Sequence, residues 1–273
     1  MSGLVFAGIA PHGSSIVGEV AGNEYELYSP LRKGVEVFGQ RLEKHNVDTI
    51  VILTPHGLRL KGYNAVYTCE YCRGTLSQFG KSVSTEYKCD KPMALNILSG
   101  IEAEGIPCVG CNFGALEGTE SNIEMDWGTL IPLWFCGAQK STKPGIVVIG
   151  PTREIPFKQL ITIGKIIAET AEKSGKEVAL IASADQSHVH SSEGPYGYDP
   201  SAKIYDEKIC DMVKRDALDE LLDIDMSLVE KAKPDSLWQM LILLGALQVK
   251  KLKGNFITYQ IPSYFGMMVA SYE

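Results

Sequence analysis

Short apolar runs alternate along the chain with longer stretches whose apolar residues recur at helical spacing. The short runs are typical of buried strands, which we predict at residues 4–10, 49–54, 63–69, 145–150, 177–184, 255–261 and 266–272. The helical spacing predicts helices at residues 31–45, 91–104, 127–136, 157–174, 201–222 and 234–249. Strands that alternate with helices predict an α/β fold, with a mostly parallel or mixed central sheet covered by helices on both faces.

The chain shows no internal division. Its 273 residues contain no repeat, no low-complexity tract and no linker-like boundary, so we predict a single domain over residues 1–273. The net charge of −7 argues against a general nucleic-acid surface. No apolar run reaches the roughly 18 residues of a membrane span, and no signal peptide is recognisable, so we expect a cytoplasmic protein without membrane or nucleic-acid partners.

Three predicted strands turn polar where they end. The strands at residues 4–10 and 49–54 each run into a Pro-His-Gly turn, which carries His12 or His56. The strand at residues 177–184 ends in a polar cluster that includes Asp185, Ser187 and His188. Ligands of open α/β sheets bind outside the carboxyl ends of the strands, so we interpret the three strand ends as one site.

The twin Pro-His-Gly turns favour a metal site. Neutral imidazole is a good ligand for iron, zinc or copper, and two histidines with one carboxylate are the ligand set of non-haem Fe(II) oxygenases. The candidate carboxylates are Asp126, Asp185, Glu193, Glu230 and Asp235. Asp235 follows a proline at the start of an apolar helix, where an acid also stabilises the positive end of the helix dipole. The spacing alone leaves both interpretations of Asp235 open.

The seven cysteines include two CxxC pairs, Cys69 with Cys72 and Cys108 with Cys111. Two such pairs can hold structural zinc if they lie within reach of one ion. Since ordinary strands and turns account for the flanking sequence, we interpret these residues as reduced thiols without a ligand, and zinc as the alternative.

Taken in order, these motifs resemble one known family over nearly the whole chain. The segments that carry the resemblance are Pro11-His12-Gly13, Pro55-His56-Gly57, Asp126 to Leu133, Ser183 to His188, Trp238 with Gly245 to Leu247, and Tyr264 to Ala270. They look like the class III extradiol ring-opening dioxygenases, the relatives of the catalytic subunit of protocatechuate 4,5-dioxygenase. The resemblance implies Fe(II), with zinc or manganese as alternatives, held by His12, His56 and a carboxylate. It favours Asp235 as that carboxylate, with Glu230 in reserve.

The resemblance also implies an activity in aromatic compound catabolism. A catechol- or aminophenol-like substrate and dioxygen would meet at the metal, with His188 as general base and then general acid. Asp185 or Ser187 would orient that histidine. Trp127, Asp185 and Tyr196 would line the substrate pocket. A homodimer is the family expectation. The alternatives are a zinc-dependent hydrolase on the same scaffold and a metal-binding interaction protein without activity.

Two residues depart from the family pattern. Trp127 stands where the family usually has the histidine of Asp-His-Gly, and Asp235 stands where it usually has glutamate. The histidine helps to bind substrate or transfer protons in the ring-opening relatives, so its loss raises the question of whether a simple catechol is cleaved. The shorter aspartate requires the backbone to approach the metal more closely.

Overall fold

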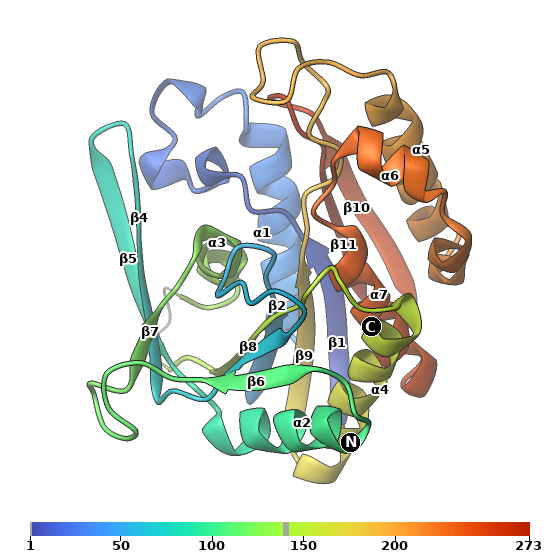
Figure 1. The fold of residues 1–273 in the computed structure, drawn as a ribbon. Helices are drawn as coiled ribbons and strands as arrows, with labels where there is room; N and C mark the ends of the chain where they lie inside the picture. The colour runs from blue at the N-terminus through green and yellow to red at the C-terminus, as the bar shows by residue number, and fades with distance from the viewer. Residues whose placement is uncertain (1, 139–141) are drawn as a thin grey trace.

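An eight-stranded mixed sheet forms the centre of the computed structural model, which describes residues 2–138 and 142–273 (Figure 1). In spatial order its strands are β10 (Gly254–Gln260), β11 (Met267–Tyr272), β1 (Gly3–Ala10), β9 (Glu177–Ser183), β2 (Thr49–Leu53), β8 (Gly145–Gly150), β3 (Asn64–Tyr67) and β6 (Cys108–Cys111). The four strands β1, β9, β2 and β8 are adjacent and parallel, so their carboxyl ends lie along the same edge. Both flanks of the sheet include antiparallel pairs, and the predicted α/β fold with a mixed sheet is confirmed.

Helices cover both faces of this sheet (Figure 1). Successive residues of β2 alternate between the two cores, since Val51 and Leu53 belong to one and Ile50 and Ile52 to the other. The first core includes residues of α2 (Lys91–Ala103), α4 (Phe157–Ser174), α5 (Ser201–Lys214), α6 (Met226–Ala232) and α7 (Leu237–Val249). The second includes residues of α1 (Ser29–Glu43) and α3 (Trp127–Phe135). No described helix has the length and apolar character needed to cross a membrane.

Helices α4 and α7 approach each other closely through glycine. A Cβ atom on Gly164 would lie 1.9 Å from the carbonyl oxygen of Ile242, and one on Gly245 would lie 2.0 Å from that of Ile161. Any larger residue at either position would push the two helices apart. This contact fixes the position of α7. The segment that precedes α7 places Asp235 at the carboxyl edge of the sheet.

A smaller three-stranded sheet lies beside the central one (Figure 1). Its strands, in spatial order, are β5 (Lys81–Lys88), β4 (Tyr71–Gln78) and β7 (Asn122–Glu124). The hydrophobic pattern does not predict this sheet, because β4 and β5 are largely polar and one side of the hairpin faces solvent. Phe79 and Gly80 connect β4 to β5 with φ angles of 50° and 71°, which is the positive-φ pair of a tight hairpin turn.

Two predicted helices have different bounds in the structure. The helix predicted at residues 201–222 ends at Lys214, because Asp216 adopts a φ of 58° and a 3₁₀ segment, Leu218–Asp223, follows. The helix predicted at residues 234–249 begins at Leu237, so Asp235 precedes it and does not lie in its first turn. Asp235 is held in this position by the segment that follows β9, since its backbone N–H donates to the carbonyl oxygen of Asp185.

Asp90 is a buried N-cap that stabilises the fold and gives a first testable prediction. Its carboxylate accepts hydrogen bonds from the backbone N–H of Met93 and from Thr49, and it pairs with Lys176. Asp90→Ala should lower the free energy of unfolding by at least about 2 kcal/mol at pH 7, because the cap is lost and two buried partners are left unpaired. Urea denaturation measures the difference.

The stability that Asp90 contributes should depend on pH. Burial raises the pKa of Asp90, but Lys176, Thr49 and the Met93 N–H outweigh this effect and leave the pKa below its ordinary value. The stabilisation is therefore present above the unfolded-state pKa of about 4, and it disappears as the pH falls through the folded-state pKa. Asp225→Ala, which removes an exposed N-cap, is the control and should cost less. An equal loss in both variants, or a loss independent of pH, would contradict this account.

Candidate metal centre

The carboxyl edge of the parallel strands brings four predicted site residues together. His12 follows β1, His56 follows β2 and His188 follows β9, while Asp235 reaches them from the segment before α7. Glycine allows the first turn to pack tightly, because a Cβ atom on Gly13 would lie 2.9 Å from the sulfur of Met267. The edge therefore places three imidazoles around one carboxylate.

Three side-chain atoms form a nearly equilateral triangle at this edge. His12 Nε2 lies 3.1 Å from His56 Nε2 and 3.3 Å from Asp235 Oδ2, and the remaining side, from His56 Nε2 to Asp235 Oδ2, is 3.2 Å. Metal–ligand bonds of about 2.0–2.2 Å hold neighbouring ligand atoms roughly 3.0–3.5 Å apart. The triangle therefore has the size of one face of a metal coordination shell.

The hydrogen bonds behind the triangle leave its atoms free to bind a cation. His12 Nδ1 lies 2.9 Å from Ser183 Oγ, and a proton shared there leaves the lone pair of Nε2 pointing to the centre. Asp235 Oδ1 accepts the backbone N–H of Asp185 at 2.9 Å. Its other oxygen, Oδ2, is buried and has no aligned hydrogen-bond donor among the described residues. An unsatisfied carboxylate oxygen beside two imidazole nitrogens fits a divalent metal.

The electrostatics of the site also favour a positive charge at its centre. Asp185 lies beside His12, with its Oδ2 3.2 Å from Nε2 and its Oδ1 accepting the backbone N–H. Burial lowers the pKa of His12, but Asp185 and Asp235 outweigh this effect and raise it to about 9. Burial raises the pKa of Asp185 to about 7, whereas the neighbouring histidines hold the pKa of Asp235 below its ordinary value. A metal cation would take the place of the proton that these carboxylates otherwise hold on His12.

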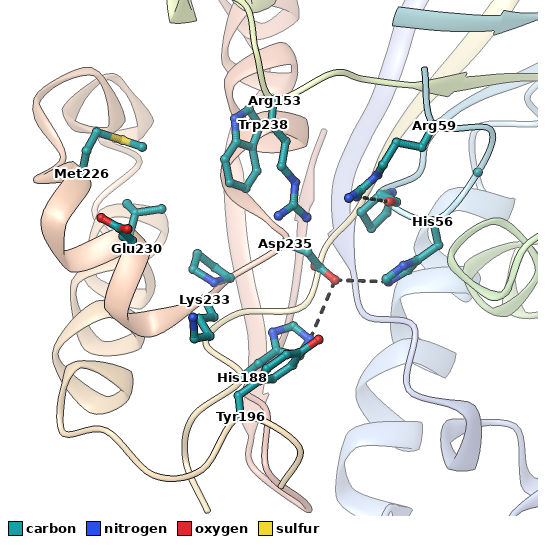
Figure 2. A pocket seen from close by; sticks show the side chains of 14 residues that line it. His56, Arg59, Arg153, His188, Tyr196, Met226, Glu230, Lys233, Asp235 and Trp238 are labelled. Carbon is teal, nitrogen blue, oxygen red and sulfur yellow. Dashed lines mark hydrogen bonds and ion pairs between the residues drawn. The ribbon is translucent and has the colours of Figure 1, made fainter. Parts of the chain in front are cut away.

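His188 lies next to the triangle without belonging to it. Its Nε2 is 3.8 Å from Asp235 Oδ2 (Figure 2). Its ring stacks on Phe265 at a centroid distance of 5.2 Å with the planes 7° apart. Its Nδ1 is buried without a hydrogen-bond partner in the described chain. Burial lowers the pKa of His188, so the neutral imidazole is favoured. A neutral imidazole held in this position can accept a proton at the side of the site.

A cavity of about 800 Å³ opens from this site (Figure 2). His56, His188 and Asp235 contribute to its wall, and Tyr196 lines it as predicted. Three cationic side chains also line it, namely Arg59, Arg153 and Lys233. The guanidinium of Arg153 stacks 4.2 Å above the ring of Trp238, and Arg153 forms no salt bridge within the described residues. The cavity thus joins a metal-ligand triangle to unpaired positive charge.

Three predicted residues lie elsewhere than expected. Asp185 is buried against His12 and does not line the cavity, so it supports His12 and does not orient His188. Trp127 is 49% exposed and stacks on His56 at a centroid distance of 4.3 Å. It lines a second cavity of about 860 Å³, which shares His56 and Gly57 with the first. Glu230, the reserve ligand, is an exposed residue that lines the first cavity away from the triangle (Figure 2).

Other residues of the site were not recognised from the sequence. Asp126, considered as a ligand, instead caps α3 and accepts a hydrogen bond from Thr54 Oγ1 at 2.6 Å. Thr54 Oγ1 in turn accepts the backbone N–H of His56, so this pair holds the second Pro-His-Gly turn. Arg153 follows β8 by three residues, and the strand-end argument that found the histidines would have found it as well.

Comparison with known proteins identifies the family of this chain. The family model described as the catalytic LigB subunit of aromatic ring-opening dioxygenase matches residues 7–270. The chain belongs to the LigB family. The match confirms the resemblance that the ordered motifs indicated, and it supports an aromatic ring-opening dioxygenase scaffold around the His12, His56 and Asp235 triangle.

Two relatives of this LigB-family chain extend the comparison. Protein CA_C1420 of Clostridium acetobutylicum is 27% identical over 253 residues, which are 92% of this chain and 54% of that protein. The chain therefore spans about half the length of this curated relative. The crystal structure of the uncharacterized protein JW3007 from Escherichia coli K12 shares the fold, with a TM-score of 0.60 and 16% identity over 98% of this chain and 99% of that one.

Proposed function

We propose that this LigB-family chain is a non-haem Fe(II)-dependent extradiol dioxygenase that opens the ring of a catechol- or aminophenol-like aromatic. The observation that supports this best is the triangle of His12 Nε2, His56 Nε2 and Asp235 Oδ2, with sides of 3.1–3.3 Å, beside a cavity and a separate histidine. Two histidines and one carboxylate on one side of an iron leave positions for substrate and dioxygen.

The residues of the site have separate roles in this proposal. His12, His56 and Asp235 hold the metal, and Ser183 and Asp185 fix His12 from behind. Fe(II), when bound there, would hold the substrate and dioxygen together and lower the barrier to their reaction. His188 accepts a proton from a substrate hydroxyl and returns it later, because its neutral ring lies beside the site and is fixed by stacking on Phe265.

The cavity favours an aromatic that carries a negative charge. Arg153 and Arg59 line it, and the only hydrogen bond that Arg59 makes among the described residues goes to the carbonyl oxygen of Pro55. A guanidinium without a carboxylate partner binds a substrate carboxylate through two parallel hydrogen bonds. We infer that the substrate is a carboxylated diol or aminophenol, with its carboxylate at Arg153 and its reacting heteroatoms at the triangle.

Arg153→Met tests the substrate class. A charge-assisted pair contributes about 1.5–3 kcal/mol, so KM for a carboxylated catechol such as protocatechuate should rise roughly 10- to 100-fold. The KM for unsubstituted catechol should stay within about twofold, because it has no carboxylate to lose. Steady-state oxygen uptake with both compounds measures the two values. An equal change for both would show that Arg153 supports the pocket and does not select the substrate.

Anaerobic reconstitution tests the activity itself. The protein should bind close to one Fe(II) per chain, consume oxygen only when a diol or aminophenol is added, and form a ring-opened product with a new visible or near-ultraviolet absorption. Tight zinc with esterase or amidase turnover would support the hydrolase alternative. Stoichiometric metal without turnover of any of these compounds would support the binding role and overturn the dioxygenase proposal.

A further inference from the structure

A second group of metal-binding side chains lies away from the cavity. Cys69, Cys72 and Cys89 are all buried, and their sulfur atoms lie 3.7, 3.7 and 3.5 Å apart. Cys108 and Cys111, the second CxxC pair, do not belong to this group. The first CxxC pair therefore lies next to Cys89, which is not part of either CxxC motif. The described residues do not form a site in which both CxxC pairs share one ion.

The distances between the three sulfur atoms match those around a bound zinc ion. A tetrahedral zinc ion with bonds of about 2.3 Å to sulfur holds its thiolates roughly 3.8 Å apart. A disulfide would require two of the sulfurs to approach to about 2.05 Å, and it would leave the third without a partner. Three mutually equidistant sulfurs therefore fit a shared cation better than a covalent pair.

The spacing of the three cysteines along the chain also fits a zinc site. The spacing Cys69-x₂-Cys72-x₁₆-Cys89 matches the first three positions of a common zinc-binding pattern. No other histidine, aspartate or glutamate belongs to the group in the described chain, which leaves a fourth position for water.

We propose that Cys69, Cys72 and Cys89 bind a zinc ion as three thiolate ligands of a tetrahedral site. The site joins the end of β3 to both strands of the β4–β5 hairpin. Cys69 follows β3, Cys72 lies in β4, and Cys89 follows β5 and pairs with Ile146 of β8. The zinc ties the small sheet, which the hydrophobic pattern did not predict, to the central one. None of the three cysteines lines the cavity beside His188, so this zinc site is separate from the site of the proposed reaction.

Metal analysis of three variants separates this site from the histidine site. His12→Ala disables the histidine site, and the full-length variant purified from zinc-supplemented cells should retain about one zinc per chain. Adding Cys72→Ser to it should remove that zinc. Adding Cys210→Ser instead should not, because Cys210 is a buried thiol outside the group and its sulfur has Met268 Sδ as its hydrogen-bond partner. Zinc retained in the first double variant would overturn the proposal.

Cobalt spectroscopy of the wild-type chain gives an answer that does not depend on any variant folding. Co(II) added to zinc-depleted protein should produce thiolate-to-cobalt charge-transfer absorption in the near ultraviolet, because imidazole and carboxylate ligands give no such band. A titration of reactive thiols should also show three cysteines that become accessible only when the metal is removed. Absence of the band with all seven thiols free, or a disulfide within the group found by mass spectrometry, would overturn the proposal.

Discussion

His56→Ala should be purified without iron and without ring-cleaving activity. His56 Nε2 contributes one corner of the triangle, at 3.1 Å from His12 Nε2 and 3.2 Å from Asp235 Oδ2. Residues that merely support metal ligands change metal affinity by about 10–100-fold when they are mutated, so removal of a ligand should exceed about 100-fold. The side chain is partly exposed at the cavity wall, and the fold should survive its truncation. Iron content after anaerobic reconstitution and oxygen uptake measure the two losses.

Two further substitutions make this result specific. His45→Ala removes a histidine that pairs with Glu273 far from the triangle, and it should leave iron content and activity unchanged. Asp235→Asn keeps the oxygen that accepts the Asp185 N–H but removes the charge, so it should lose iron as well, whereas Glu230→Gln should not. Full iron content in both the His56→Ala and Asp235→Asn proteins would show that these residues do not hold the metal.

The positions of the three histidines could be predicted from the ends of the strands. This prediction depends on the topology of the sheet and not on individual side-chain contacts. Apolar runs set the strands, and parallel strands carry whatever follows them to one edge. His12, His56 and His188 therefore met as expected. Asp235 did not follow from this argument, because it lies before α7, and only the order of motifs shared with the family singled it out.

Two features could not be predicted from the sequence: the residue on which Trp127 stacks, and the polar β4–β5 hairpin. Trp127 was expected to line the substrate pocket, but α3 begins one residue after Asp126, and the tryptophan stacks on His56 and lines the second cavity instead. A histidine introduced at position 127 would therefore lie next to a metal ligand and not across the cavity from His188. The β4–β5 hairpin was missed for a different reason, since its polar outer side hides the strand pattern. Without the hairpin, Cys89 was not recognised as a neighbour of Cys69 and Cys72.

The position of Trp127 divides the surroundings of His56 into two sides. On one side the cavity contains Arg59, Arg153 and His188, and on the other the second cavity contains Trp127, Phe113 and other apolar residues. The carboxylated aromatic of the proposed function would fit the first cavity, where three cationic side chains lie near His188. The stacked indole shields the second side of His56, so the substrate should approach the metal from the side of His188.

His188→Ala should keep the iron and lose most of the turnover. His188 Nε2 is 3.8 Å from Asp235 Oδ2, outside the triangle of ligand atoms, and its ring lines the cavity where the substrate would bind. General acid–base catalysis contributes about 10²–10⁴-fold, so kcat should fall by roughly this factor while iron content stays near the wild-type value. The KM for a carboxylated catechol should change little, because Arg153 still binds the carboxylate. Stopped-flow absorption of the ring-opened product and metal analysis of the same sample measure both effects.

Two companion variants separate proton transfer from packing. Phe265→Leu removes the ring that stacks on His188 but leaves the imidazole, so it should slow turnover much less than His188→Ala does. His188→Gln keeps a polar side chain of similar reach that cannot take a proton, and it should be as slow as the alanine variant. If His188→Gln restored the rate, the residue would act by hydrogen bonding alone. If His188→Ala lost its iron, His188 would be a fourth ligand, and three histidines with an aspartate would favour the zinc hydrolase over the dioxygenase.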